Sequence, residues 1–340
     1  MKTIMCSIIL LPSLLWAQTE SKESESTTTS YVVEEVHEDA MSGDATGEEE
    51  VSDDEAFFTP VEPTVPDSIA KRAKEANGFL QQRENRELDT VNNPFVLTPH
   101  KPNYFLPLSY TSNPNDRAFL GSNDPESLQS VEFKFQLSIK FPVAYEVVGR
   151  DTSLWFAYTQ QAYWQAYNSD ISAPFRDTNH EPEAFVITKP KHGFLGIKPN
   201  YISYGINHQS NGQSADLSRS WNRIYMDFVF EKGDTAFSFK PWYRIPESSS
   251  NDDNPNIENY FGYGEFNLIH IIDDYSIDFM LRNNLKASDN KGAIQVGFNF
   301  PLWGKTRGYI QYFNGYGQSL LDYNHRTQSL GIGVMLTNWL

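Results

Sequence analysis

Hydrophobic and polar residues alternate along most of the chain from about residue 102 onward. The clearest run covers residues 131 to 141, where eleven consecutive residues alternate without a break. Its apolar positions are Val131, Phe133, Phe135, Leu137, Ile139 and Phe141, and its polar positions are Glu132, Lys134, Gln136, Ser138 and Lys140. Successive side chains of a β-strand point to opposite faces, so the run predicts a strand with one apolar and one polar face. A strand of this length can cross a membrane at a tilt.

Twelve such segments are predicted, separated by loops rich in turn-forming residues. They begin near residues 102, 130, 153, 183, 196, 219, 235, 257, 273, 291, 305 and 327. An even number of antiparallel strands closes a barrel with both ends on the same side. In the last segment Leu330 and Ile332 alternate with Gly331 and Gly333, which suits a wall with bulky residues outside and small ones inside. The pattern predicts an all-β fold, a twelve-stranded antiparallel transmembrane β-barrel over residues 101–340.

A soluble β-sandwich has the same period of two, so alternation alone leaves both architectures open. The strand length and the 14% aromatic content favour the barrel, because transmembrane barrels carry aromatic girdles at both interfaces. An export signal favours it too. Lys2, the apolar run from Ile4 to Trp16 and then Ala17 predict a signal peptide over residues 1–17. The only cysteine, Cys6, lies within it, so we expect no disulfide and no thiolate metal site in the mature chain.

The net charge of −17 is concentrated near the N-terminus. Residues 18 to 60 hold 14 Asp or Glu and one Lys, with few large apolar groups to bury, so we expect residues 18–66 to be a disordered acidic segment. A weak helical pattern over residues 67 to 88 predicts a short helix in a periplasmic lead-in, residues 67–100. The remainder carries no basic stripe, which argues against nucleic-acid binding.

Two neighbouring predicted strands carry chemistry on their apolar faces. In segment 201–210 the even positions are Ile202, Tyr204 and Ile206, followed by His208 and Ser210. The next segment begins its apolar face with Asn222 and continues with Ile224, Met226, Phe228 and Phe230. If the two pair antiparallel around the loop 211–218, Asn222 comes near His208 and Ser210. An imidazole can then accept the serine proton while a third group fixes the ring, on a face that points to lipid.

Several motifs together resemble the bacterial outer membrane phospholipase A family. The strongest is Asn207-His208-Gln209-Ser210-Asn211-Gly212-Gln213-Ser214 followed by Ser218-Arg219-Ser220-Trp221-Asn222-Arg223. Further segments resemble the family in order: Tyr158-Thr159-Gln160, Pro174-Phe175-Arg176, Lys240-Pro241-Trp242-Tyr243, Asp253-Asn254-Pro255 and Gly331-Ile332-Gly333-Val334-Met335-Leu336. The resemblance covers roughly residues 91 to 340.

The resemblance implies a calcium-dependent serine hydrolase of the outer membrane, active as a homodimer on acyl esters of membrane phospholipids (phospholipase A1/A2 and lysophospholipase type). It implies Ser210 as nucleophile, His208 as base and Asn222 as the group that orients the base. The Gly212 amide would form the oxyanion hole.

The implied calcium ligands are the main-chain carbonyl of Gln213, the hydroxyl of Ser218 and, from the other subunit, the hydroxyl of Ser172. Gln160 would lie in the dimer interface, since an unpaired amide facing lipid is costly. Gln213 stands where relatives have Arg, which matters little for a carbonyl. Ala215 stands where an Asp is frequent, and this puts an auxiliary calcium site of the monomer in doubt but not the dimer site.

The alternative from another class is a passive pore or structural barrel that keeps the motif as loop scaffolding. Twelve strands leave a narrow lumen, and the inward Glu132, Lys134 and Arg223 would fill it further. This weighs against a general porin.

The acidic segment is expected to be dispensable for catalysis. Deleting residues 18–60 should leave barrel assembly and the maximal hydrolysis rate unchanged, because the segment has little to bury and lies far in sequence from the triad. Fatty-acid release as a function of calcium concentration checks it. A truncated protein that assembles normally but needs much more calcium would show that the segment collects cations for the site.

Overall fold

The computed structural model describes residues 78–91, 97–120, 127–193, 198–250, 252–304 and 306–338. The expected signal peptide and acidic segment lie outside these ranges, and so does the lead-in before residue 78. Their boundaries therefore stay predictions.

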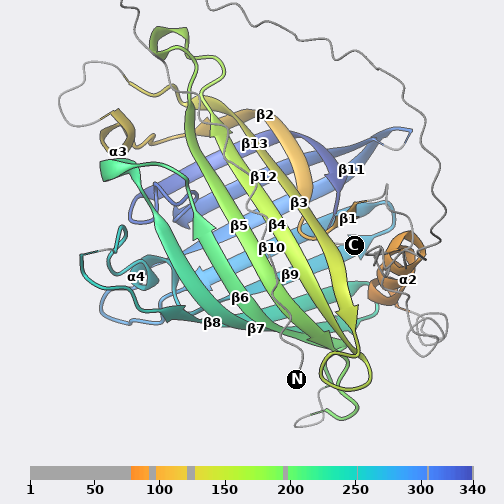
Figure 1. Cartoon of the computed structure of the whole chain (residues 1–340). Helices are drawn as coiled ribbons and strands as arrows, with labels where there is room; N and C mark the ends of the chain where they lie inside the picture. Colours follow the sequence, from red (N-terminus) through yellow and green to blue (C-terminus); the bar gives the residue numbers. More distant parts are fainter. Residues whose placement is uncertain are drawn as a thin grey trace, which may run out of the picture. The chain divides into compact units, whose positions relative to one another are not determined.

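Within the described residues, twelve long antiparallel strands form a closed β-barrel (Figure 1). They are β2 (Asn103–Thr111), β3 (Val131–Tyr145), β4 (Thr152–Trp164), β5 (Phe175–Thr188), β6 (Tyr201–Ser210), β7 (Ser220–Lys232), β8 (Thr235–Ile245), β9 (Gly264–Ile272), β10 (Tyr275–Asn283), β11 (Gly292–Trp303), β12 (Thr306–Tyr316) and β13 (Arg326–Thr337). Neighbours in sequence pair with each other, β13 pairs with β2, and the β2–β3 and β3–β4 pairings complete the circle. The two-residue β1 (Thr98–Pro99) adds to β3.

The alternation seen in the sequence separates an apolar outer face from a polar inner face. On β3, Phe141 is 52% exposed on the outside, whereas Glu132 and Lys134 are 2% and 1% exposed inside. In a closed barrel every strand pairs on both edges, so each backbone N–H and C=O group can be hydrogen-bonded within the hydrocarbon region. The predicted fold class is therefore confirmed. No helix among the described segments has the length and apolar character needed to cross a membrane.

Nine of the twelve expected strand starts lie within two residues of the observed ones, and three were wrong. β5 begins at Phe175 instead of near 183, because its outer positions include His180 and Pro182, which interrupt the apolar outer row. β6 begins at Tyr201 instead of near 196, directly after the Pro199-Asn200 turn. At 257 the chain forms α4 (Glu258–Phe261), and β9 starts only at Gly264, after the helix has ended on Gly262 with a φ of 77°.

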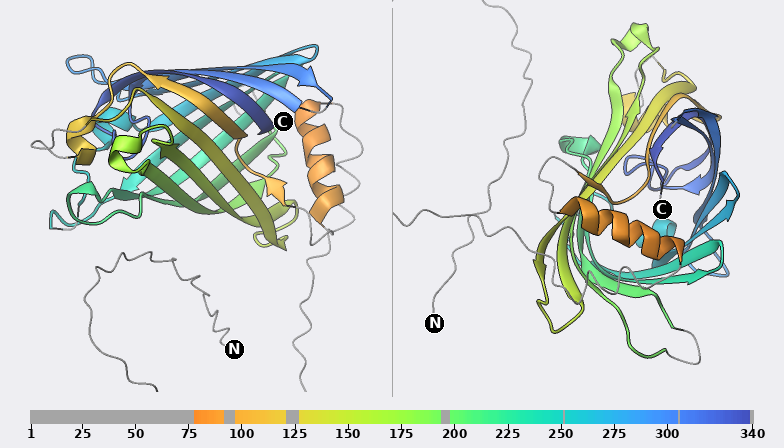
Figure 2. Two further views of the ribbon diagram at one scale, coloured as in Figure 1. Left: turned by 90° about the horizontal axis from the view of Figure 1, so that it is seen from above. Right: turned by 90° about the vertical axis from the view of Figure 1, so that its right-hand side faces the viewer.

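A helix is present in the lead-in as expected, but α2 (Phe79–Val91) starts within the predicted span and continues to Val91. It lies across one end of the barrel (Figure 2). Leu80 packs inside against Val229, Ala236 and Ile269. Ion pairs hold the polar side of α2 to the strands: Glu87 to Lys140 at 2.8 Å and Glu84 to Lys189 at 2.5 Å. The remaining short elements are α3 (Asp116–Leu120) and the 3₁₀ turns η1 (Ser169–Ile171) and η2 (Ala215–Leu217).

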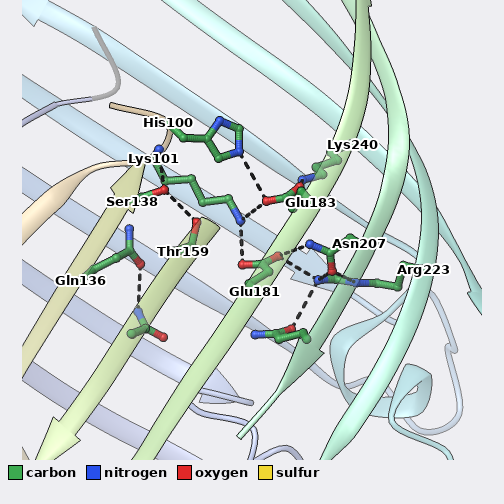
Figure 3. Close-up of polar contacts among 12 residues, drawn as sticks. His100, Lys101, Gln136, Ser138, Thr159, Glu181, Glu183, Asn207, Arg223 and Lys240 are labelled. Atoms are coloured by element: carbon green, nitrogen blue, oxygen red, sulfur yellow. Dashed lines mark hydrogen bonds and ion pairs between the residues drawn. The ribbon is translucent and has the colours of Figure 1, made fainter. Parts of the chain in front are cut away.

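The barrel interior holds paired charges (Figure 3). Lys101 contacts Glu181 at 2.7 Å and Glu183 at 2.9 Å, and Lys240 approaches Glu183 at 3.4 Å. Arg223 contacts Glu181 at 3.0 Å. These pairs join β5 to β7, to β8 and to the segment before β2, beside an interior cavity of 410 Å³. The inward residues thus tie the wall together from inside, as a buried charge requires a partner.

A second buried network is centred on Arg176. Arg176 binds Glu132 through two nitrogens, at 3.0 and 3.1 Å, and Asp322 at 2.6 Å, and all three side chains are buried. Arg176→Ala should lower the free energy of unfolding by about 3 kcal/mol, because it leaves two buried carboxylates without their cation. Urea titration of the protein in lipid vesicles measures this. The exposed Arg326→Ala is the matched control, and an equal effect of both variants would contradict the prediction.

Candidate active site

β6 and β7 pair antiparallel, and the register sets His208 directly opposite Asn222. Nδ1 of His208 lies 2.9 Å from Oδ1 of Asn222. Since an amide oxygen only accepts, Nδ1 carries the proton and Nε2 is left with a lone pair. This tautomer, inferred from the hydrogen bond, is the one that a general base needs.

The pair lies on the outer wall. Ile206 and Ile224, which are paired next along the two strands, are 58% and 50% exposed, and Met226 is 42% exposed. His208 is itself exposed and Asn222 is partly buried. The chemistry-bearing end of the hairpin therefore faces the surroundings of the barrel and not its lumen.

Ser210 ends β6 on the same face as His208, two residues further along. Among the residues that the structure describes, the Ser210 hydroxyl has no recorded hydrogen-bond partner. The bond between Ser210 and Nε2 of His208 therefore stays a prediction.

The loop after Ser210 is organised by the buried Asn211. Its Nδ2 donates to the Leu217 carbonyl at 2.8 Å, and its Oδ1 accepts from the Arg219 and Gln213 amides at 2.9 and 3.3 Å. Gly212 has a φ of 64°, a conformation in which glycine is not strained. Asn211 thus fixes the main chain of the two residues expected to supply an amide and a carbonyl.

The expected metal ligands come from two loops. Gln213 and Ser218 belong to the β6–β7 loop, and Ser172 follows η1 in the β4–β5 loop, where it is exposed. Ser218 donates from Oγ to Oδ2 of Asp253 at 2.6 Å. In the described part of the chain, no three His, Cys, Asp or Glu side chains cluster as a metal site. An ion here would be bound by carbonyl and hydroxyl oxygens, with Asp253 as the adjacent negative charge.

Gln160 is expected in the dimer interface, and the strand register connects it to Ser210, the expected nucleophile. It pairs with His180 on β5, and His180 pairs with Ser210 on β6. The Gln160 amide has no recorded hydrogen-bond partner among the described residues. Nδ1 of His180 lies 2.6 Å from the Tyr158 hydroxyl.

Three polar neighbours of the site were not foreseen from the sequence. Asp253 and His180 are described above, and Glu247 accepts a hydrogen bond from Nδ2 of Asn222 at 3.1 Å. Glu247 continues the outward positions Tyr243 and Ile245 at a spacing of two, which is a signal that could have indicated it. Asp253 lies in a loop that offers no such periodicity.

The family model described as Phospholipase A1 matches residues 80–336. The Phospholipase A1 of Escherichia coli K12 is 33% identical over 282 residues, covering 83% of this chain and 96% of the relative.

Two solved structures show the same fold. The Salmonella typhi outer membrane phospholipase dimer with bound calcium is 36% identical with a TM-score of 0.68, and the match covers 73% of this chain and 95% of that one. An active-site mutant of the Escherichia coli outer membrane phospholipase A, in which an asparagine is replaced by alanine, is 33% identical with a TM-score of 0.68, covering 80% and 98%.

The family model alone spans more than half of the chain, and the relatives are enzymes. The passive-barrel alternative is therefore set aside. The chain belongs to the phospholipase A1 family and is an outer-membrane phospholipase, a carboxylic ester hydrolase.

Proposed function

We propose that the protein is a calcium-dependent, dimeric phospholipase A1/A2 and lysophospholipase that cleaves the acyl esters of its own membrane with Ser210, His208 and Asn222. The observation that carries the proposal is the 2.9 Å contact between His208 Nδ1 and Asn222 Oδ1 on the outer wall, beside Ser210. A phospholipid in the surrounding bilayer reaches such a site without entering the barrel.

The reaction follows from the roles of the three side chains. Nε2 of His208 takes the proton as Ser210 Oγ attacks the acyl carbonyl, and it returns the proton to the leaving lysophospholipid oxygen. Water then attacks the acyl-enzyme by the same route in reverse. Asn222 holds the imidazole and accepts from its N–H, and the Gly212 amide would donate to the carbonyl oxygen as that oxygen gains charge.

The donors in the β6–β7 loop fit calcium. Ca²⁺ binds carboxylate, carbonyl and hydroxyl oxygens. Asn211 fixes the main chain at Gln213, and the Ser218 hydroxyl of the same loop contacts the carboxylate of Asp253. When bound, the ion supplies positive charge near the developing oxyanion. This compensates for a neutral Asn222, which stabilises an imidazolium less than a carboxylate does.

A homodimer completes the proposed site. Ser172 is exposed on another loop, and Gln160 carries an amide on the outer face without a recorded partner in the described part of its own chain. A second subunit would supply a partner for Gln160 and bring its Ser172 hydroxyl to the calcium. The calcium-bound dimer of the Salmonella relative supports this arrangement.

Ser210→Ala should leave a folded barrel with essentially no hydrolysis of dispersed phospholipid, because it removes the nucleophile. Asn222→Ala should cost less, since orienting the base contributes less than the attacking oxygen. Fatty-acid release and heat-modifiable gel mobility report activity and folding separately. The exposed Ser248→Ala is the control, and substantial turnover by Ser210→Ala would refute the triad.

Ser172→Ala should raise the calcium concentration for half-maximal activity about tenfold, as expected for the loss of one oxygen ligand worth about 1.4 kcal/mol. The same variant should fold normally, and Ser169→Ala in the same turn should behave like the parent. Calcium titration together with cross-linking in detergent measures both effects. Full activity from a demonstrably monomeric preparation would exclude the dimer site.

A further inference from the structure

The Asn222 side chain has two orientations with opposite consequences for His208. With Oδ1 toward the ring, Nδ1 carries the proton and Nε2 can accept one from Ser210. With the NH₂ group toward the ring, Nδ1 must accept, the proton moves to Nε2, and the base is lost. A carboxylate, with two equivalent oxygens, has no such wrong orientation. An asparagine in this position therefore needs a neighbour that fixes its amide.

Glu247 lies where such a neighbour is needed. Its Oε1 is 3.1 Å from Nδ2 of Asn222, on the side away from His208. Ile245 is the register partner of Asn222 on β8, and Glu247 follows two residues later, so it continues the same outer row. An ionised Glu can only accept, and it therefore selects the NH₂ group of the amide and leaves Oδ1 for the histidine.

The carboxylate of Glu247 has the Asn222 amide as its hydrogen-bond partner. Among the described residues it has no recorded ion pair, whereas Arg244 on the same segment pairs with Asp252 at 2.6 Å and Glu258 at 3.1 Å. Hydrogen-bonded groups polarise one another, so a carboxylate on the NH₂ group increases the negative charge on Oδ1. The ring N–H of His208 then meets a stronger acceptor.

We propose that Glu247 is a positioning residue that acts through Asn222. It fixes the orientation of the amide and therefore the tautomer of His208. Through its hydrogen bond to the amide it also supplies the negative charge that asparagine lacks. This inference rests on the proposed triad. Glu247 is not needed to hold the loop that follows β8. The ion pairs of Arg244 and the bond from the Ser220 amide to Asn254 Oδ1 at 2.8 Å already anchor that loop.

The first part of the test is the effect on turnover in the full-length protein. Glu247→Ala should lower kcat about tenfold with little change in KM, as expected when a charge-assisted hydrogen bond to the catalytic machinery is lost. Glu247→Gln should lose less, because its carbonyl still accepts the same bond. Asp274→Asn, which removes one exposed negative charge from the turn between β9 and β10, should retain the parental kcat. Gel mobility confirms folding of each variant.

The second part separates positioning from structure. In an Asn222→Asp background the third group has no wrong orientation, so adding Glu247→Ala should cost nothing or raise kcat by relieving repulsion between two carboxylates. The same tenfold loss in both backgrounds would overturn the proposal. So would parental kcat for Glu247→Ala in the parent.

Ser210→Ala, measured in parallel, distinguishes a failure of the proposed triad from a failure of the positioning role of Glu247. If it is inactive while the Glu247 variants match the parent, the triad holds and the positioning role is wrong. If it retains turnover, the triad and the role of Glu247 are both overturned.

Discussion

Closure of the sheet in lipid is the constraint on which the rest of this structure depends. Hydrocarbon offers no hydrogen bonds, so each strand pairs on both sides and the β3–β4 pairing must complete the circle. Closure gives the sheet an inner and an outer face, and the two faces require side chains of opposite polarity. The inner face can carry charge if it is paired, as Glu183 is with Lys101 and Lys240, while the outer face must be apolar.

The proposed active site lies at a local exception to that division. Where β6 ends and β7 begins, the outer row changes from Ile206 and Ile224 to His208 and Asn222. These polar groups satisfy one another through a direct hydrogen bond, and Glu247 satisfies the far side of the amide. In the proposed function, this position on the outer wall gives the site access to the membrane's own lipid.

The sequence predicted the strands and pairings that a single pattern determines, such as strict alternation or a short connecting loop. Strict alternation located β3, and the short loop between β6 and β7 was enough to pair His208 with Asn222. It failed where two rules compete: β5 was placed eight residues late because its outward positions include His180 and Pro182. Asp253 stood in a segment that resembles the family, but its contact with Ser218 was not predicted, because this contact joins two loops without periodicity.

The most direct measurement is fatty-acid release from a bilayer in which the purified protein is embedded, with calcium, with a chelator, and with calcium restored. A lipid-facing site that depends on an oxygen-bound calcium ion predicts release in the first state, arrest in the second and recovery in the third. Release that continues at the same rate in the chelator would contradict the account, and so would the absence of release from the surrounding bilayer in all three states.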